Sequence, residues 1–185
     1  MPRKFMFTRE EIVKTALDIT REKGISAVTA RGLAEKLGSS SKPVFSIFEN
    51  MSELHCAIIE AANREYSEFT DRYIKSGKYT PYKASGIAYI FFAKENRELF
   101  KLLFMRDRSK EIISENREEL APIIDMIVKN TGMSKEKAYF FHIEMWLFVH
   151  GIATMAATSY LNWDDEFISN TLTDVYTGLK IRFES

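Results

Sequence analysis

The sequence predicts an all-α protein of about nine helices, with an N-terminal three-helix helix-turn-helix head followed by a C-terminal helical bundle domain. Apolar residues recur at helical spacing, and capping residues and glycines mark the ends of most segments. No sustained alternation of polar and apolar residues and no Asn-Gly or Asp-Gly pair indicates a strand or a hairpin. The prolines leave long stretches free of helix breakers; they are Pro2, Pro43, Pro81 and Pro122.

The first two helices carry start and stop signals. The segment Thr8-Arg9-Glu10-Glu11 matches a capping box, in which the Thr8 hydroxyl and the Glu11 carboxylate each satisfy a free backbone N–H. Gly24 is placed to end this helix. Thr29 is expected to cap a second helix, which Gly38 closes after about two turns.

A third short helix is expected to begin among Ser39–Ser41 and to end near Phe48. Pro43 is compatible with it because the first turn needs no intrahelical N–H donor. The segment Asn50-Met51-Ser52-Glu53 interrupts the chain and caps the next helix. The later helices are expected at residues 52–75, 81–94, 96–105, 110–130, 134–161 and 164–183.

The charge of the chain is unevenly distributed. The 185 residues contain 26 Lys and Arg and 26 Asp and Glu, so the formal net charge is zero. Residues 1–48, however, carry nine basic and five acidic residues, a net charge of +4, and the remainder carries −4. The neutral total therefore combines a basic head with an acidic body, and the head keeps the electrostatic signature of a nucleic-acid binder.

Several classes of protein are disfavoured by the composition. A single cysteine, Cys56, allows no intramolecular disulfide and no multi-cysteine zinc site, which suits a cytoplasmic location. The longest apolar candidate for a membrane span, residues 145–160, is interrupted by His150 and Gly151, so we expect a buried helix there. His142 and His150 lack partners at ligand spacing, so neither a metal site nor a cofactor is expected. No catalytic constellation or phosphate-binding loop appears, which argues against an enzyme.

The second and third helices have the form of a helix-turn-helix, whose second helix enters the major groove of DNA. No acidic residue occurs between Gly38 and Phe48, where the polar residues are small hydroxyls and Lys42. Such a surface can approach a phosphate backbone closely. A short helical hairpin without a DNA-binding role is the alternative that periodicity leaves open.

Residues 8–60 resemble the TetR family of transcriptional regulators in spacing and in residue type. The segment Leu33-Ala34-Glu35-Lys36-Leu37-Gly38-Ser39-Ser40 is similar to the family pattern Leu-Ala-x-x-Leu-Gly-Val-Ser, and Asn50-Met51-Ser52-Glu53-Leu54 to the pattern Asn-Lys-x-x-Leu. Beyond this segment, Trp146 with His150-Gly151 resembles the signature of one C-terminal subgroup.

The resemblance implies a DNA-binding domain at residues 1–51 and an effector-binding and dimerisation domain at residues 52–185. It implies that Val44 and Phe48 anchor the third helix in the core, and that Thr29 caps the second helix and touches a phosphate. The expected DNA contacts are Arg3, Lys4, Thr29, Arg31, Ser40, Ser41, Lys42, Pro43, Phe45, Ser46 and Asn50.

Two positions depart from the family pattern in ways that weaken phosphate binding. Phe45 stands where the family usually has a tyrosine, and Met51 where it usually has a lysine. We expect Arg3 and Lys4 in the N-terminal tail to compensate. Deleting residues 1–5 would then flatten the salt dependence of DNA binding by about one or two units of slope.

Aromatic residues are abundant in the C-terminal part of the chain. Each one alone is more typical of core than of a binding site, but together with the resemblance they favour an apolar effector pocket. The expected pocket residues are Phe91, Phe92, Phe100, Phe104, His142, Met145, Trp146 and His150. The last two helices are apolar on more than one side, so one side can pack on the domain and the other on a second subunit.

These observations predict a homodimeric, ligand-responsive transcriptional regulator. We expect a repressor that a small molecule releases from a palindromic operator of double-stranded DNA. The alternative is a helical small-molecule-binding or interaction module that has lost specific DNA binding, which the departures at Phe45 and Met51 favour.

Overall fold

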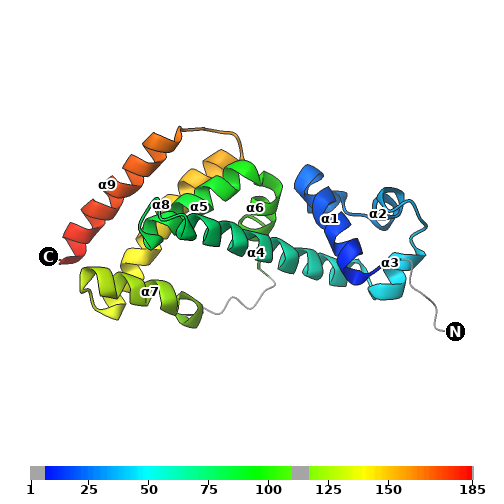
Figure 1. Cartoon of the computed structure of the whole chain (residues 1–185), viewed down its shortest axis with the longest axis horizontal. Coiled ribbons are helices and arrows are strands. Elements are labelled where there is room, and N and C mark those ends of the chain that lie inside the picture. The colour runs from blue at the N-terminus through cyan, green and yellow to red at the C-terminus, as the bar shows by residue number, and fades with distance from the viewer. Residues whose placement is uncertain (1–6, 110–116, 185) are drawn as a thin grey trace. The chain divides into compact units, whose positions relative to one another are not determined.

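The computed structural model describes residues 7–109 and 117–184, and within these residues the fold is all-α (Figure 1). It has nine α-helices and a short 3-10 helix, and no strand occurs in these ranges, as the sequence predicted. The α-helices are α1 (Arg9–Lys23), α2 (Ala30–Lys36), α3 (Lys42–Ile47), α4 (Met51–Lys75), α5 (Pro81–Glu95), α6 (Arg97–Phe104), α7 (Arg117–Thr131), α8 (Lys135–Ala157) and α9 (Asp165–Glu184).

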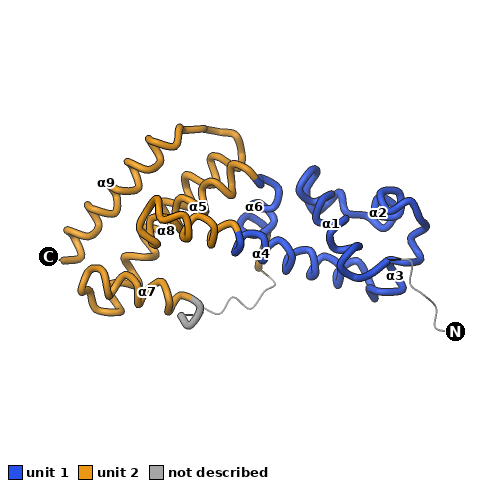
Figure 2. Tube along the Cα trace, in the orientation of Figure 1, with its two compact units in different colours: residues 1–68, 96–106 blue, residues 69–95, 107–185 orange. Residues whose placement is uncertain are grey.

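The chain divides into two compact units (Figure 2). Unit 1 comprises residues 1–68 and 96–106, and unit 2 comprises residues 69–95 and 107–185, each as far as the structure describes them. Helix α4 therefore begins in unit 1 and ends in unit 2, and α6 belongs to unit 1. The boundary that we expect at residue 51 is one between a DNA-binding and an effector-binding function, and it differs from the boundary between the packing units. It stays a prediction.

Helix α1 is the centre of unit 1. Its N-terminus has the predicted capping box, with Thr8 Oγ1 accepting from the Glu11 N–H at 3.1 Å and Glu11 Oε2 accepting from the Thr8 N–H at 2.8 Å. The buried stripe that includes Ile12 and Ala16 packs within the unit, where α1 contacts α2 and α6. These contacts bury one face of α1, which supplies most of the stability of a short helix.

A three-residue polar link joins distant segments of unit 1. The Arg21 guanidinium donates to both carboxylate oxygens of Glu65 in α4, at 2.8 and 2.6 Å, and to Asn96 Oδ1 at 2.6 Å. Asn96 lies directly before α6. This bidentate arrangement fixes the relative positions of α1, α4 and the start of α6 more specifically than apolar packing does.

The turn between α2 and α3 depends on Gly38. The Gly38 N–H donates to the Glu35 carbonyl at 3.1 Å, and the Ser39 N–H donates to the Ala34 carbonyl at 2.9 Å. This pattern is a Schellman motif, which needs a left-handed residue, and Gly38 has φ of 64°. The predicted end of the second helix is thus confirmed.

Unit 2 is built around α8. Helices α5, α7 and α9 all pack against it, and α9 also contacts α5. Small residues allow close approach; Gly86 of α5 lies against Val149 of α8 and Leu172 of α9. Among the described residues, α8 alone is long and apolar enough to cross a membrane, a criterion that core helices of soluble proteins also meet. This helix, which we expected to be buried, is only partly buried: 44% of its most apolar stretch lies inside the structure, and Trp146 and Leu147 are exposed.

Some predicted boundaries were wrong. Helix α8 ends at Ala157 and not at Leu161, because Ser159 adopts a left-handed conformation with φ of 57° and the chain leaves the helix there. The 3-10 helix at Ile25–Ala27 was not predicted. The expected start of the seventh helix at residue 110 lies outside the described residues, and its described part runs from Arg117 to Thr131.

Candidate nucleic-acid interface

Helix α3 is oriented by two buried side chains. Val44 and Phe48 are almost completely buried, as predicted, and lie one turn apart on the face that packs on the rest of unit 1. Lys42, Phe45 and Ser46 are exposed on the opposite side. The core anchors therefore determine which residues α3 can present to a ligand.

The hydroxyl groups around α3 have different roles. Ser41 occupies the N-cap position, within the stretch where the third helix was expected to begin, but its side chain makes no capping hydrogen bond. The Ser46 hydroxyl donates to the Pro43 carbonyl at 2.7 Å, and the Ser39 hydroxyl to the Ser40 carbonyl at 2.9 Å. Because these two hydroxyls already donate to nearby backbone carbonyls, they have less capacity to donate to DNA.

The basic side chains of unit 1 fall into paired and unpaired groups. Lys36 pairs with Glu22 at 3.1 Å, and Arg9 and Arg21 also hold carboxylates. Arg31 on α2 and Lys42 on α3 are exposed, and no carboxylate among the described residues pairs with either. Each helix of the helix-turn-helix therefore carries one exposed cation without such a partner. Arg3 and Lys4 lie outside the described residues.

Thr29 performs the capping role predicted for it. Its side-chain oxygen accepts from the Gly32 N–H at 3.0 Å. A Cβ on Gly32 would lie 3.2 Å from that oxygen, so the glycine leaves room for the cap. Thr29 itself is exposed, which leaves the start of α2 accessible.

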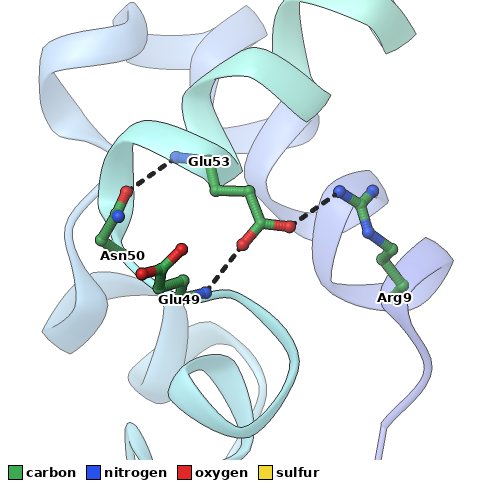
Figure 3. Close-up of polar contacts among 4 residues, drawn as sticks. All are labelled: Arg9, Glu49, Asn50 and Glu53. Atoms are coloured by element: carbon green, nitrogen blue, oxygen red, sulfur yellow. Dashed lines mark hydrogen bonds and ion pairs between the residues drawn. The ribbon is translucent and has the colours of Figure 1, made fainter.

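A polar cluster, of which the sequence predicted only the cap by Asn50, joins the segment after α3 to the first turns of α4 and α1 (Figure 3). Asn50 Oδ1 accepts from the Glu53 N–H at 3.0 Å, and Glu53 Oε2 accepts from the Glu49 N–H at 2.7 Å. Glu53 Oε1 accepts from the Arg9 guanidinium at 3.2 Å, and that guanidinium lies 4.7 Å from the centroid of the Phe48 ring.

The Glu53 carboxylate is stabilised in its charged form by this cluster. The Glu49 N–H first, and then the Arg9 guanidinium, lower the pKa of Glu53 from its ordinary value. The signal in the sequence was the spacing Asn50-x-x-Glu53, which indicated a cap; the partner Arg9, 44 residues away, had no local signal. The cluster fixes the end of α3 relative to α4, and so positions the candidate interface.

The remaining predicted DNA contacts occupy this same part of unit 1. Ser40 and Ser41 precede α3, Pro43 lies in its first turn, and Asn50 precedes α4. The Asn50 side chain is committed to the cap of α4 through its oxygen. The structure therefore gathers the described candidates in one unit, and their contact with DNA stays a prediction.

The predicted effector residues do not all lie in one unit. Phe100 and Phe104 belong to unit 1, where Phe104 packs edge-on against Tyr66 at 5.1 Å. The others belong to unit 2, namely Phe91, Phe92, His142, Met145, Trp146 and His150. Phe92, Phe100 and Met145 are buried, which is typical of core. A shared pocket stays a prediction.

Two tyrosine–histidine pairs connect α5 and α8 within unit 2. Tyr82 Oη lies 3.2 Å from His142 Nδ1, and Tyr89 Oη lies 2.8 Å from His150 Nδ1. Burial lowers the pKa of both histidines and raises the pKa of Tyr82, so all of these groups favour their neutral forms. The exposed ring of Trp146 stacks on His150 with centroids 5.1 Å apart. The tyrosines supply hydrogen-bond partners that were absent from our predicted set.

Helices α8 and α9 expose large apolar side chains, although apolar residues of this size are normally buried. Leu147 is 57% exposed. The others on these helices are Phe140, Trp146, Phe167 and Ile181. Scattered exposed apolar residues need no explanation, but a concentration on two adjacent helices is typical of an interaction surface.

Known proteins were compared with the chain by sequence and by structure. The family model described as the Tetracyclin repressor-like, C-terminal domain matches residues 82–174, half of the chain. No curated protein matched the sequence.

Among solved structures, the fold is similar to that of a TetR variant from Acinetobacter baumannii AYE in complex with minocycline. The TM-score is 0.64 at 17% identity, and the match covers 97% of this chain and 99% of that one. The fold and the family model agree with the resemblance seen in residues 8–60, and this chain belongs to the TetR family of transcriptional regulators.

Proposed function

We propose that this protein is a ligand-responsive, DNA-binding transcriptional regulator, and that it represses transcription until a small molecule releases it from a palindromic operator. The observation that carries the proposal is the exposed face of α2 and α3, where Arg31 and Lys42 have no carboxylate partner among the described residues. The proposed place of action is the cytoplasm.

The charges of this face suit a phosphate backbone. Unpaired cations release counterions from DNA on binding, whereas a cation already paired with a carboxylate contributes less. No acid lies between Gly38 and Phe48 to repel the phosphates. We infer that α3 enters the major groove and that Arg31 approaches the DNA from the start of α2.

Dimerisation through α8 and α9 would give two such faces. The exposed apolar residues of these helices support a twofold interface in which the same surface of each subunit takes part. Two heads would then meet half-sites about 34–36 Å apart. Each head alone has a modest positive charge, so binding would depend strongly on both heads acting together.

Release by an effector requires coupling between the body and the head. Helix α4 is suited to this role because it is one continuous helix with residues in both units. A coupling free energy of about 1–3 kcal/mol changes operator affinity by about 5- to 150-fold. The effector would bind among the aromatic and histidine side chains of the body.

A second candidate function is a helical small-molecule-binding or interaction module without specific DNA binding. The presence of Phe45 and Met51, where the family usually has a hydroxyl and a charge that contact phosphate, favours this alternative.

The test is selection of DNA by the full-length chain from a pool of random duplexes, followed by a gel shift with the selected sequence and with the promoter region of its own gene. Enrichment of a palindrome supports the regulator. If no duplex is enriched above a scrambled control, the module without DNA binding is the better description.

A further inference from the structure

We propose that Phe45 reads the 5-methyl group of thymine in the major groove, so that the operator carries a thymine opposite the middle of α3 in each half-site. The proposal rests on the proposed function as a DNA-binding regulator and adds to it the chemistry by which one base is selected.

The orientation of Phe45 follows from its neighbours. Val44 and Phe48 are 0% and 1% exposed, so the face of α3 that carries them is fixed against the core. Phe45 therefore points away from the core, and its side chain is 49% exposed. Among the described residues of α1, α2 and α3, it is the one large apolar side chain that is exposed, and none of them stacks on its ring.

The other groups on α3 leave little hydrogen-bonding capacity for base recognition. Ser46, beside Phe45, already donates its hydroxyl to the Pro43 carbonyl. Pro43 has no N–H and presents only an apolar ring. Lys42 is a flexible point charge, which suits a phosphate better than a defined base edge. The largest rigid surface that α3 offers is thus the Phe45 ring.

A phenyl ring cannot distinguish bases by hydrogen bonds, because it has no donor and no strong acceptor. In the major groove each base pair presents a pattern of donors and acceptors, and the thymine 5-methyl is the apolar group among them. Contact with that methyl removes apolar surface of both partners from water. A cytosine or an adenine at the same place would instead set a polar amino group against the ring and lose hydration.

The charge of the two helices is consistent with this occupant. Lys42 lies on α3 with Phe45, and Arg31 lies on α2; both are exposed and have no carboxylate partner among the described residues. An apolar protein partner would have no need of these cations. DNA, in contrast, offers phosphates to the cations and base edges to the ring.

Deoxyuridine substitution tests the proposal, because it deletes only the methyl group of thymine. The full-length chain first selects an operator from random duplexes, and each thymine is then replaced singly by deoxyuridine. Fluorescence anisotropy measures the affinity of each duplex. We expect about a fourfold loss at one or two positions in a half-site, from the free energy of burying one methyl group, and about 15-fold when both half-sites are substituted.

Variants of Phe45 assign the effect to this side chain. In Phe45→Ala the affinity should fall and the deoxyuridine effect should disappear, because the contacting ring is gone. In Phe45→Leu, which keeps an apolar contact, part of the effect should remain. Phe45→Tyr is the matched control, since it retains the ring and restores the family's hydroxyl, and it should keep the deoxyuridine effect. Thermal unfolding checks that each variant is folded, as expected for an exposed position.

Three results would overturn the proposal. If a specific operator is found and no deoxyuridine changes its affinity, Phe45 does not read a methyl group, although the proposed function stands. The same conclusion follows if the effect is unchanged in Phe45→Ala, which would point to another reader of the methyl. If no specific duplex is selected at all, the proposed function and this inference fail together.

Discussion

At the scale of single residues, two basic side chains on α2 have contrasting surroundings. Lys36 is held by Glu22 at 3.1 Å, whereas Arg31 has no carboxylate partner among the described residues. Both are exposed, so their difference lies in the counter-charge and not in accessibility. Lys36 is thus neutralised by an acidic partner, whereas Arg31 keeps its charge uncompensated among the described residues.

This contrast gives a prediction for operator binding. Arg31→Ala should lower the affinity by about 1–3 kcal/mol if Arg31 contacts a base. Lys36→Ala on the same helix is the matched control and should cost much less. Anisotropy titrations with the selected operator would measure both. Equal losses of affinity in the two variants would show that the ion pair with Glu22 does not make Lys36 less important for DNA binding than Arg31.

A second residue-scale prediction concerns acid. The pKa of Glu53 is lowered from its ordinary value of 4.5, so its charged form is favoured in the folded state. The contribution to stability is therefore complete above pH 4.5 and is lost as the pH falls through the lowered pKa. Glu53→Gln should be less stable than the wild type at pH 7, and the difference should shrink as the pH falls below 4.5 and the carboxylate takes up a proton.

Urea unfolding at pH 7 and at a series of lower pH values would measure this difference. Glu49→Gln is a suitable control, because Glu49 contributes its backbone N–H to the cluster, which the substitution keeps. A Glu53→Gln variant as stable as the wild type at pH 7 would contradict the role given to the cluster.

At the scale of elements, the turn between α2 and α3 depends on one conformation. Gly38 has a positive φ, and no heavy atom lies within 4 Å of the place where a Cβ would be. Gly38→Ala should therefore lower the free energy of unfolding by about 1–2 kcal/mol through the backbone alone. Gly38→Asn should cost less, because asparagine tolerates this conformation. Thermal unfolding would rank the three proteins, and equal stability of all three would contradict this explanation.

Helix ends could be predicted because their causes are local. The cap at Thr8, the cap at Thr29 and the turn at Gly38 each depend on groups within five residues along the chain. The burial of Val44 and Phe48 agreed with the roles that the family resemblance gave them.

Contacts between distant residues could not be predicted in the same way. Arg21 meets Glu65 and Asn96 only because the folded chain brings three segments together. The positions of the candidate interface could be predicted from the sequence. The sequence did not show which of their polar groups are free to bond a ligand. The Ser46 hydroxyl, for example, turns back to its own helix. A rotamer preference of this kind leaves no trace in the spacing of residues.

At the scale of the whole molecule, the exposed apolar side chains of α8 and α9 lead to a prediction about assembly. Leu147→Glu would place a charge in the proposed interface, where it would be desolvated without a partner, so the dimer should dissociate. Operator affinity should fall with it, because one head would bind without the other.

Sedimentation and gel shifts would measure these two effects. Asn162→Glu, which adds the same charge at an exposed position between α8 and α9, is the control. A Leu147→Glu protein that still sediments as a dimer would place the interface elsewhere.

The membership of α6 in unit 1 affects how the protein is made. During synthesis, residues 1–68 leave the ribosome well before residues 96–106, yet both segments form the same compact unit. The nascent head must therefore wait for α6 before the apolar side of α1 is fully covered and Arg21 can reach Asn96. A translation arrest between residues 69 and 95 would leave a head with an uncovered surface, which chaperones would bind and proteases would cut.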